Sequence, residues 1–328
     1  MSTSIFNPNP APPLAENSPN TREIAARLKI RLAERYHVLR LIGLGGMASV
    51  YLVRHRILHS LFAVKVLHPA QAEQPELLAR FRREGLLGAR LSAHPNIAPV
   101  LDVGDGDGLH YLLMPYIRGE DLDHLLARVG PLSLQDAVLT VLQINDAVHF
   151  AWNHGVLHCD LTPGNVRLNE FGQFILFDFG LAQTGFSQQH PVLPPTSKPH
   201  PGTPLYMSPE RFRGEGIDIR SDLYALGAIL YELLTGEAAF HGDSIEEIER
   251  RHLASGCAFS HPRLQKHAFI QPLLKSLLAP LAADRFSDPV ELDRALRMLV
   301  NHPPCFSISP EVEFEQKPAS SRRRLSAS

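Results

Sequence analysis

The spacing of apolar residues along this 328-residue chain changes near Gly119. Before that point, short runs with apolar residues at alternate positions, such as YHVLRLIG, SVYLVRHR and LFAVKVL, are joined by a glycine-rich turn and a polar turn. This pattern is typical of antiparallel strands. After that point, apolar residues recur at helical spacing over 122–127 and 134–154. The sequence therefore predicts an α+β chain in which a small β-rich lobe precedes a larger α-helical lobe.

The chain divides further by composition and periodicity. The first lobe is expected to contain one helix, over 75–91, and two later strands, near 98–103 and 110–114. Both ends of the chain are rich in proline and polar residues, which is typical of disorder. The predicted divisions are a disordered tail over 1–20, a short amphipathic helix over 21–35, the first lobe and a hinge over 36–118, the second lobe over 119–300, and a second disordered tail over 301–328.

Composition excludes several classes of protein. A formal net charge of -2 gives no basic field of the kind that draws a protein to nucleic acid, so no nucleic-acid partner is expected. The three cysteines, Cys159, Cys257 and Cys305, form no CxxC pair, which argues against a disulfide framework or a zinc site. The longest apolar window, 223–234, contains Glu232 and is too short to span a membrane. Without a signal-peptide pattern at the N-terminus, a cytoplasmic location is expected.

A possible phosphate-binding turn lies between the first two expected strands. Residues 43–50 read GLGGMASV, and glycines at such a turn let backbone amides approach a triphosphate closely. Alone, a glycine-rich turn is more often only a turn. Lys65, in the strand pattern FAVKVL, would need an anion if it faced inwards. Glu84, on the helix that follows, could pair with this lysine and fix its position.

A second group of polar residues follows in the α-helical part. Asp160 and Asn165 lie in HCDLTPGNV, and Asp178 lies in FDFG. Two carboxylates and an amide that converge on one cleft make an oxygen-rich site, which suits Mg²⁺ and phosphate oxygens. Each motif alone is ambiguous. Together with the glycine-rich turn and Lys65, and in this order, they match the signature set of protein kinases.

On these motifs the chain resembles the Hanks-type (eukaryotic-like) serine/threonine protein kinases, most closely those of bacteria, over about residues 36–299. GTPLYMSPE, at 202–210, stands at the family's substrate-binding segment, and SDLYALGAILYELLTG resembles its buried central helix. The resemblance implies the bilobed protein kinase fold and transfer of the γ-phosphate of ATP to protein serine or threonine hydroxyls. ATP and Mg²⁺ are the expected cofactors, with Mn²⁺ as an alternative ion.

The resemblance also assigns roles to residues of this chain. Asp160 would orient the acceptor hydroxyl and take its proton, and Asn165 and Asp178 would hold the metal ion. Lys65, Asn165 and Thr162 complete the expected catalytic set with Asp160. The implied nucleotide-binding residues are Gly43, Leu44, Gly45, Gly46, Val50, Ala63, Lys65, Glu84, Met114, Pro115 and Ile117. The family's buried ion pair would be formed by Arg285 and Glu210, and Asp222 would hold the catalytic-loop backbone.

Four positions depart from the family pattern. Ala48 replaces a loop glycine, and Gly88 replaces a bulky residue that would stack on Phe179, which suggests a looser active arrangement. Cys159 replaces an arginine that binds a phosphorylated activation loop. We therefore expect that phosphorylation of the loop hydroxyls is not the main activating switch; the residues concerned are Thr184, Ser187, Thr196 and Ser197. Thr162 replaces a lysine that touches the γ-phosphate, and loss of one such donor costs about 10²–10³ in rate.

Three functions are compared on this basis. The first is an active but weakened protein kinase whose partner is a protein with a Ser/Thr acceptor. The preference for serine or threonine over tyrosine is inferred from GTPLYMSPE, in which Thr203 lies near the acceptor site. The alternative is a nucleotide-binding pseudokinase that acts as a scaffold or regulator. A small-molecule phosphotransferase of similar fold is not expected to contain GTPLYMSPE. No membrane span is expected, and a dimer or a regulatory partner that binds the terminal segments is left open.

Overall fold

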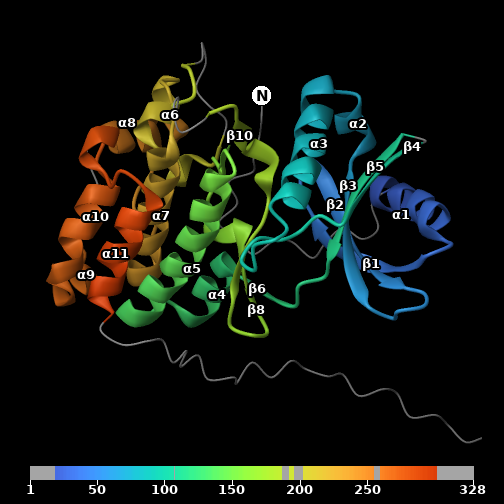
Figure 1. Ribbon diagram of the computed structural model, residues 1–328, viewed down its shortest axis with the longest axis horizontal. Helices are drawn as coiled ribbons and strands as arrows, with labels where there is room; N and C mark the ends of the chain where they lie inside the picture. The colour runs from blue at the N-terminus through green and yellow to red at the C-terminus, as the bar shows by residue number, and fades with distance from the viewer. Residues whose placement is uncertain (1–18, 107, 187–191, 196–201, 255–258, 301–328) are drawn as a thin grey trace, which may run out of the picture.

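The computed structural model describes residues 19–106, 108–186, 192–195, 202–254 and 259–300. In these ranges the chain forms two lobes, a small β-rich N-lobe and a larger helical C-lobe (Figure 1). The predicted two-lobed α+β fold is confirmed. Almost all of the two predicted tails lies outside the described residues, as do Cys257, Cys305, Ser187, Thr196 and Ser197.

The N-lobe is built on a five-stranded antiparallel sheet in the order β1-β2-β3-β5-β4. Its strands are β1 (Tyr36–Leu44), β2 (Ala48–His55), β3 (Leu61–Leu67), β4 (Asp102–Gly106) and β5 (Leu109–Pro115). Neighbouring side chains along a strand point to opposite faces of a sheet. In β3, Val64 and Val66 therefore face one side of the sheet, whereas Lys65 and Leu67 face the other.

A helix covers each face of this sheet (Figure 1). On the face of Lys65 and Leu67 lies α3 (Pro75–Arg90), which follows the short helix α2 (Pro69–Ala72). On the face of Val64 and Val66 lies α1 (Pro19–Leu32), whose Ile24 and Leu28 are fully buried. The sequence predicted a helix here without identifying its partner. The structure shows that this helix packs on the face of the N-lobe sheet that contains Val64 and Val66.

One expected strand lies elsewhere in the structure. The sequence favoured a strand near 98–103, but β4 begins at Asp102. The amide of Ala98 donates instead to the carbonyl of Leu176, and Pro99 has no amide to donate. The chain at Ala98 therefore bonds to the C-lobe, and it joins the sheet from Leu101, whose amide donates to the carbonyl of Leu113 in β5.

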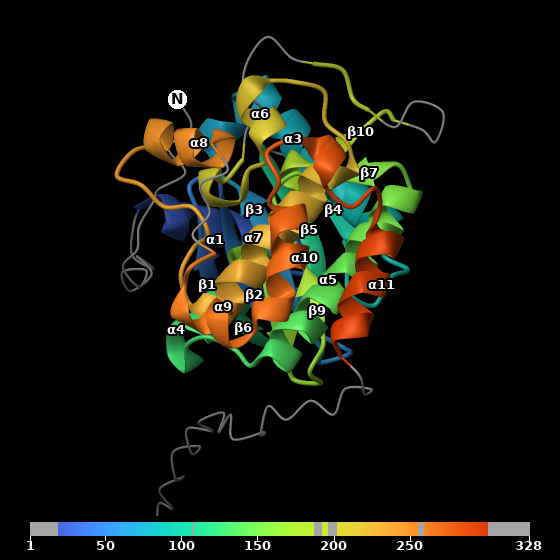
Figure 2. The same ribbon diagram turned by 90° about the vertical axis from the view of Figure 1, so that its left-hand side faces the viewer.

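The C-lobe surrounds a buried helix, α7 (Ile219–Thr235), as Figure 2 shows. Its apolar stretch forms the interior of the C-lobe, and no helix in the described ranges has both the length and the apolar composition to cross a bilayer. The remaining α-helices are α4 (Leu122–Val129), α5 (Leu134–Asn153), α6 (Pro209–Arg213), α8 (Ile245–Leu253), α9 (Pro262–Lys266), α10 (Gln271–Leu277) and α11 (Pro289–Leu299).

Short strands lie on the side of the C-lobe that faces the N-lobe, and 3₁₀ turns occur at several places along the chain. Two small sheets are formed, one in the order β6-β8-β9 and one that pairs β10 with β7. The strands are β6 (Gly119–Asp121), β7 (Val156–Leu157), β8 (Val166–Asn169), β9 (Phe174–Leu176) and β10 (Gln183–Thr184). The 3₁₀ turns are η1 (Pro163–Asn165), η2 (Phe179–Leu181), η3 (Pro204–Tyr206), η4 (Ala268–Ile270) and η5 (Ala282–Asp284). These strands hold the ends of the loops that carry Asp160 and Asp178.

Candidate active site

Lys65 forms a double hydrogen bond with Glu84 between the sheet and α3. Its ammonium donates to Oε1 at 2.6 Å and to Oε2 at 2.8 Å. A carboxylate oxygen of Asp178 lies 3.5 Å from the same nitrogen. Three of the predicted site residues are thus brought together from β3, α3 and the segment after β9.

Two glycines let α3 approach the sheet closely enough for this contact. A Cβ atom at Gly85 would lie 2.7 Å from a methyl group of Leu112, and one at Gly88 would lie 2.5 Å from a methyl group of Val100. Neither distance is compatible with a side chain. A side chain at Gly88 would meet Val100, and the Lys65–Glu84 pair is formed. The looser arrangement expected from Gly88 remains a prediction.

Burial and charge act in opposite directions on this group. Burial lowers the pKa of Lys65, but the carboxylates of Asp178 and Glu84 outweigh it and raise that pKa above its usual value. Burial raises the pKa of Asp178, yet the charge of Lys65 and the amide of Gly180 lower it overall. Lys65 is therefore a cation and Asp178 an anion, as a phosphate and a metal ion respectively require.

The backbone around Asp178 is held in an unusual conformation. Asp178 has φ 60°, in the left-handed region, and its carboxylate accepts a hydrogen bond from the Gly180 amide at 3.0 Å. The carbonyl of Gly180 in turn accepts a hydrogen bond from Arg80 of α3 at 2.9 Å. Such a backbone persists where surrounding contacts over-determine it. Sequence reasoning did not identify Arg80, which ties α3 to this turn.

Asp160 lies on the loop between β7 and β8 and is partly buried. Its Oδ1 atom accepts two hydrogen bonds from Thr203, one from the amide at 3.1 Å and one from the hydroxyl at 2.9 Å. The amide nitrogen of Asn165 donates to the main-chain carbonyl of Asp160 at 2.8 Å. Since the NH₂ group of Asn165 faces that carbonyl, its oxygen is turned the other way, where it can act as a metal ligand.

Asp222 of α7 fixes the backbone just before Asp160. Its two carboxylate oxygens accept hydrogen bonds from the amides of His158, at 2.8 Å, and Cys159, at 2.9 Å. Cys159 has φ 63° and is 3% exposed, so its thiol faces the protein interior. Burial, followed by the nearby Asp222 carboxylate, raises the pKa of this thiol to about 12. Cys159 is therefore an inert, uncharged thiol.

Thr162 is 8% exposed and lies at the start of the turn that carries Asn165. Its carbonyl accepts a hydrogen bond from the Asn165 amide at 3.1 Å. The loop geometry is thus kept with threonine at this position. What the side chain lacks is a positive charge.

The glycine-rich turn joins β1 to β2, and its conformation does not itself require glycine. Gly43, Gly45 and Gly46 are absent from the residues with positive φ, and a Cβ atom at Gly46 would meet no atom within 4 Å. The open side of the turn is where a ligand could approach the backbone. Ala48, at the position of the replaced glycine, is buried and its carbonyl accepts a hydrogen bond from the Gly45 amide at 2.9 Å.

The expected adenine-contacting residues lie on adjoining strands. Ala63 is paired with Met114 across β3 and β5, and Val50 is paired with Lys65 across β2 and β3. Pro115 ends β5, and the carbonyl of the nearby Ile117 accepts a hydrogen bond from Arg167 at 3.3 Å. The hinge is therefore anchored to the C-lobe through a carbonyl that is not one of the two groups expected to contact adenine.

The Arg285–Glu210 pair is present deep in the C-lobe. The two terminal guanidinium nitrogens of Arg285 donate to the two carboxylate oxygens of Glu210, each at 2.8 Å, and the side-chain exposures are 0% and 7%. Burial works to raise the pKa of Glu210, but hydrogen bonds from Arg285 and Ser221 lower it to about 2. This charged pair fixes α6, which directly follows the segment that holds Thr203.

A five-stranded lobe, a helical lobe and, at their junction, a Lys–Glu–Asp group beside an Asp–Asn loop together define the protein kinase class of fold and site. Comparison with known families agrees, since residues 36–303 match the family described as "Protein kinase domain". The chain belongs to this family.

Bacterial relatives are similar to most of the chain. The serine/threonine-protein kinase PknB of Mycolicibacterium smegmatis is 36% identical over 257 residues, which cover 75% of this chain and 39% of that protein. The serine/threonine-protein kinase PrkC of Bacillus subtilis is 37% identical over 227 residues, which cover 68% of this chain and 34% of that protein. The chain thus spans little more than a third of the length of these relatives. Their similarity supports the predicted kinship with bacterial serine/threonine kinases.

Proposed function

We propose that this protein is an ATP-dependent serine/threonine protein kinase that uses Mg²⁺, or Mn²⁺ as the alternative ion. The observation that carries the proposal is the Lys65–Glu84 pair, at 2.6 Å and 2.8 Å, with the Asp178 carboxylate 3.5 Å from the same lysine. A phosphate ligand would explain the buried position of Lys65, whose ammonium otherwise contacts only the carboxylates of Glu84 and Asp178. The names of the relatives, all serine/threonine-protein kinases, support the same activity.

The residues fit the ligands of this reaction. Lys65 would bind the α- and β-phosphates, with Glu84 as its support, and the backbone of the glycine-rich turn would cover the phosphates. Asp178 and the amide oxygen of Asn165 would hold the metal ion, which neutralises negative charge on the phosphates. Met114, the Pro115 carbonyl and the Ile117 amide would contact the base.

Asp160 would act as the base. One of its oxygens already accepts two hydrogen bonds from Thr203. The other oxygen is then available to orient the acceptor hydroxyl and to take its proton during transfer. Thr203 lies in the segment expected to bind the protein substrate, so the contact couples substrate binding to the position of the base. This coupling supports serine or threonine in a polypeptide as the acceptor.

Thr162 would make the enzyme slower than one with a cation at this position. The hydrogen bond from the Asn165 amide to the Thr162 carbonyl is formed, which argues for reduced turnover and not for its loss, because only the charge is absent. The pseudokinase alternative finds no support in the described contacts. Lys65, Glu84 and Asp178 form one group, and Asp160 and Asn165 form a second.

The test is transfer of labelled phosphate from Mg-ATP to a generic protein substrate, with Asp160→Asn and Thr162→Lys measured beside the natural chain. We expect Asp160→Asn to abolish transfer and Thr162→Lys to raise kcat by up to about 10²-fold, because one missing charge-stabilising donor is restored. Equal background signal from the natural chain and Asp160→Asn would refute the catalytic proposal. Unchanged kcat in Thr162→Lys would show that the missing charge is no deficit.

A further inference from the structure

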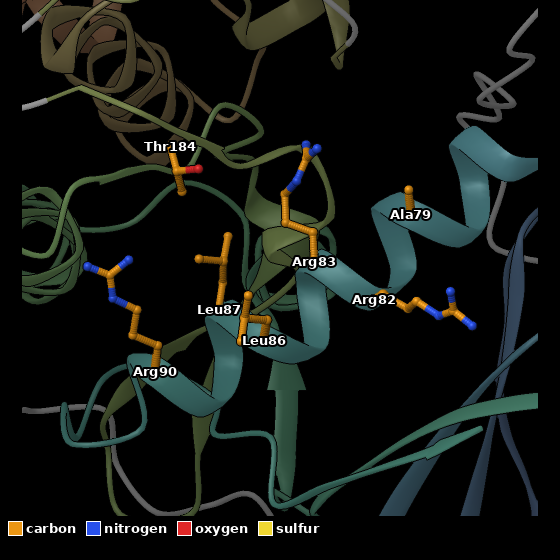
Figure 3. A pocket seen from close by; sticks show the side chains of 7 residues that line it. All are labelled: Ala79, Arg82, Arg83, Leu86, Leu87, Arg90 and Thr184. Atoms are coloured by element: carbon orange, nitrogen blue, oxygen red, sulfur yellow. The ribbon is translucent and has the colours of Figure 1, made fainter.

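The N-lobe carries polar side chains outside the candidate active site on both faces of its sheet. On the side of α3, arginines line a cavity of about 390 Å³ between this helix and β10 (Figure 3). On the other side, Ser49 of β2 and His68, which follows β3, are buried, with exposed fractions of 0% and 8%. A buried polar side chain needs a hydrogen-bonding partner. The partners of Ser49 and His68 lead to the glycine-rich turn.

Ser49 and His68 bond to each other at the end of the sheet that carries this turn. The Ser49 hydroxyl lies 2.8 Å from Nε2 of His68. Ser49 is paired with Val66 in the β2–β3 ladder, so its side chain faces the side of the sheet that α1 covers. His68 occupies the N-cap position of α2, where a polar side chain commonly bonds to the helix, but it makes no such bond. Its imidazole ring bonds to the sheet and not to the helix that it precedes.

His68 is also attached to the glycine-rich turn itself. Its amide donates to the carbonyl of Met47 at 2.9 Å. Burial lowers the pKa of its ring, and a hydrogen bond to the Gly46 backbone acts in the opposite direction. A Cβ atom at Gly46, by contrast, would meet no atom within 4 Å. The turn is therefore held by His68 on one side and open on the other.

The opposite end of this polar group reaches α1. Tyr51 lies two residues after Ser49 on β2 and faces the same side of the sheet. Its hydroxyl donates to the carbonyl of Thr21, in the first turn of α1, at 3.0 Å. Burial raises the pKa of Tyr51, and a hydrogen bond with Ser49 acts against this rise. Polar contacts thus run from α1 through Tyr51, Ser49 and His68 to the turn.

We propose that His68 is a positioning residue for the nucleotide, and that together with Ser49 and Tyr51 it joins the glycine-rich turn to α1. Gly45 and Gly46 are neighbouring glycines, which have more conformational freedom to lose than other residues. A turn that is already fixed loses less of this freedom when it closes over phosphates, so it binds them more tightly. The proposal rests on the proposed kinase function, in which the backbone of the turn covers the phosphates.

The role of His68 is tested by equilibrium binding of nucleotides to the full chain with Asp160→Asn, so that Mg-ATP is not turned over. His68→Leu removes both ring nitrogens and keeps a side chain of similar size. We expect the Kd for Mg-ATP to rise by roughly 3- to 10-fold, the range that one neutral hydrogen bond is worth. The Kd for adenosine, which has no phosphates, should stay within twofold. A rise for both ligands, as a general loss of structure would give, overturns the proposal.

Two further variants serve as controls for His68→Leu. His68→Gln can still bond to Ser49 through its side-chain amide and should recover most of the affinity for Mg-ATP. His37→Leu makes the same change at an exposed position of β1 and should leave both Kd values unchanged. In the chain with Asp160 intact, His68→Leu should raise KM for ATP by the same factor as Kd and keep kcat within twofold.

The connection along β2 is tested by combining changes. Ser49→Ala/His68→Leu should bind Mg-ATP no more weakly than His68→Leu alone, because both changes remove the same hydrogen bond. Tyr51→Phe removes only the hydroxyl that bonds to Thr21 and should raise the Kd about twofold. Additive effects of Ser49→Ala and His68→Leu overturn the shared contact, and an unchanged Kd in Tyr51→Phe overturns the connection to α1.

The same measurements separate this proposal from the proposed function. Equal binding of Mg-ATP by the parent chain and by His68→Leu refutes the positioning role and leaves the kinase function standing. No binding of Mg-ATP to the parent chain refutes both together.

Discussion

Replacement of Thr203 by valine tests whether the substrate-binding segment positions the catalytic base. Thr203 donates to Oδ1 of Asp160 from its amide at 3.1 Å and from its hydroxyl at 2.9 Å. Valine keeps the amide and the shape of the side chain and removes only the hydroxyl. A hydrogen bond to a charged group is worth roughly 1.5–3 kcal/mol, and about 1.4 kcal/mol is tenfold in rate. We expect kcat to fall by roughly 10- to 100-fold.

The assay for Thr203→Val is the initial rate of phosphate transfer to a generic protein at saturating Mg-ATP. Thr203→Ser keeps the hydroxyl and is the matched control, which should retain most of the activity. Thermal denaturation of both variants checks that the fold is intact. A valine variant within twofold of the natural chain would refute the reasoning, as would a serine variant that loses as much activity as valine.

Three further predictions concern the fold that supports the site. Gly88→Leu should lower stability by about 1–3 kcal/mol in thermal denaturation, because the space beside Val100 is filled; a variant as stable as the natural chain contradicts this. Burial lowers the pKa of His252 in the folded protein to about 3. The stability that neutral His252 contributes is therefore fully present above the pKa of the unfolded state, about 6.5, and is lost as pH falls towards 3. Urea denaturation should show a loss of about 2 kcal/mol from this group between pH 7 and pH 5, and His252→Gln should have a shallower dependence; an equal slope would exclude His252. Arg285→Ala should cost about 3–5 kcal/mol in urea denaturation, because the buried Glu210 loses its partner, and a loss below 1 kcal/mol would be inconsistent with a buried charged pair.

The fold could be predicted from the sequence because apolar residues recur at strand spacing in the first lobe and at helical spacing in the second. The strand near 98–103 was misplaced, since alternation alone does not reveal that the Ala98 amide bonds to Leu176 of the other lobe. The helix before Tyr36 was predicted from the spacing of its apolar residues. Its partner was not, because that spacing shows which side of a helix is apolar and not which surface it covers.

The polar residues of the site could be predicted because their order along the chain follows a known pattern. The pairing of Lys65 with Glu84, for example, was predicted from the order of these motifs. The contacts of Arg80 with Gly180, and of Thr203 with Asp160, were not predicted, because they join loops and helices that no local motif relates. The contact of Gly88 with Val100 was likewise not predicted, because the two residues lie in different segments of the chain. Sequence motifs thus identified the residues that carry charge, but not the neighbours that hold them.

The position of α1 has a practical consequence for any shortened form of this protein. The family match begins at residue 36, beyond the end of α1 at Leu32. A protein begun at Tyr36 would expose the face of the sheet that contains Tyr51, Val64 and Val66. It would also lose the burial of Ile24 and Leu28, each worth about 1.5–3 kcal/mol, and gain an apolar surface prone to aggregation. A stable shortened form of this protein is therefore expected to begin before its recognised domain, near Pro19.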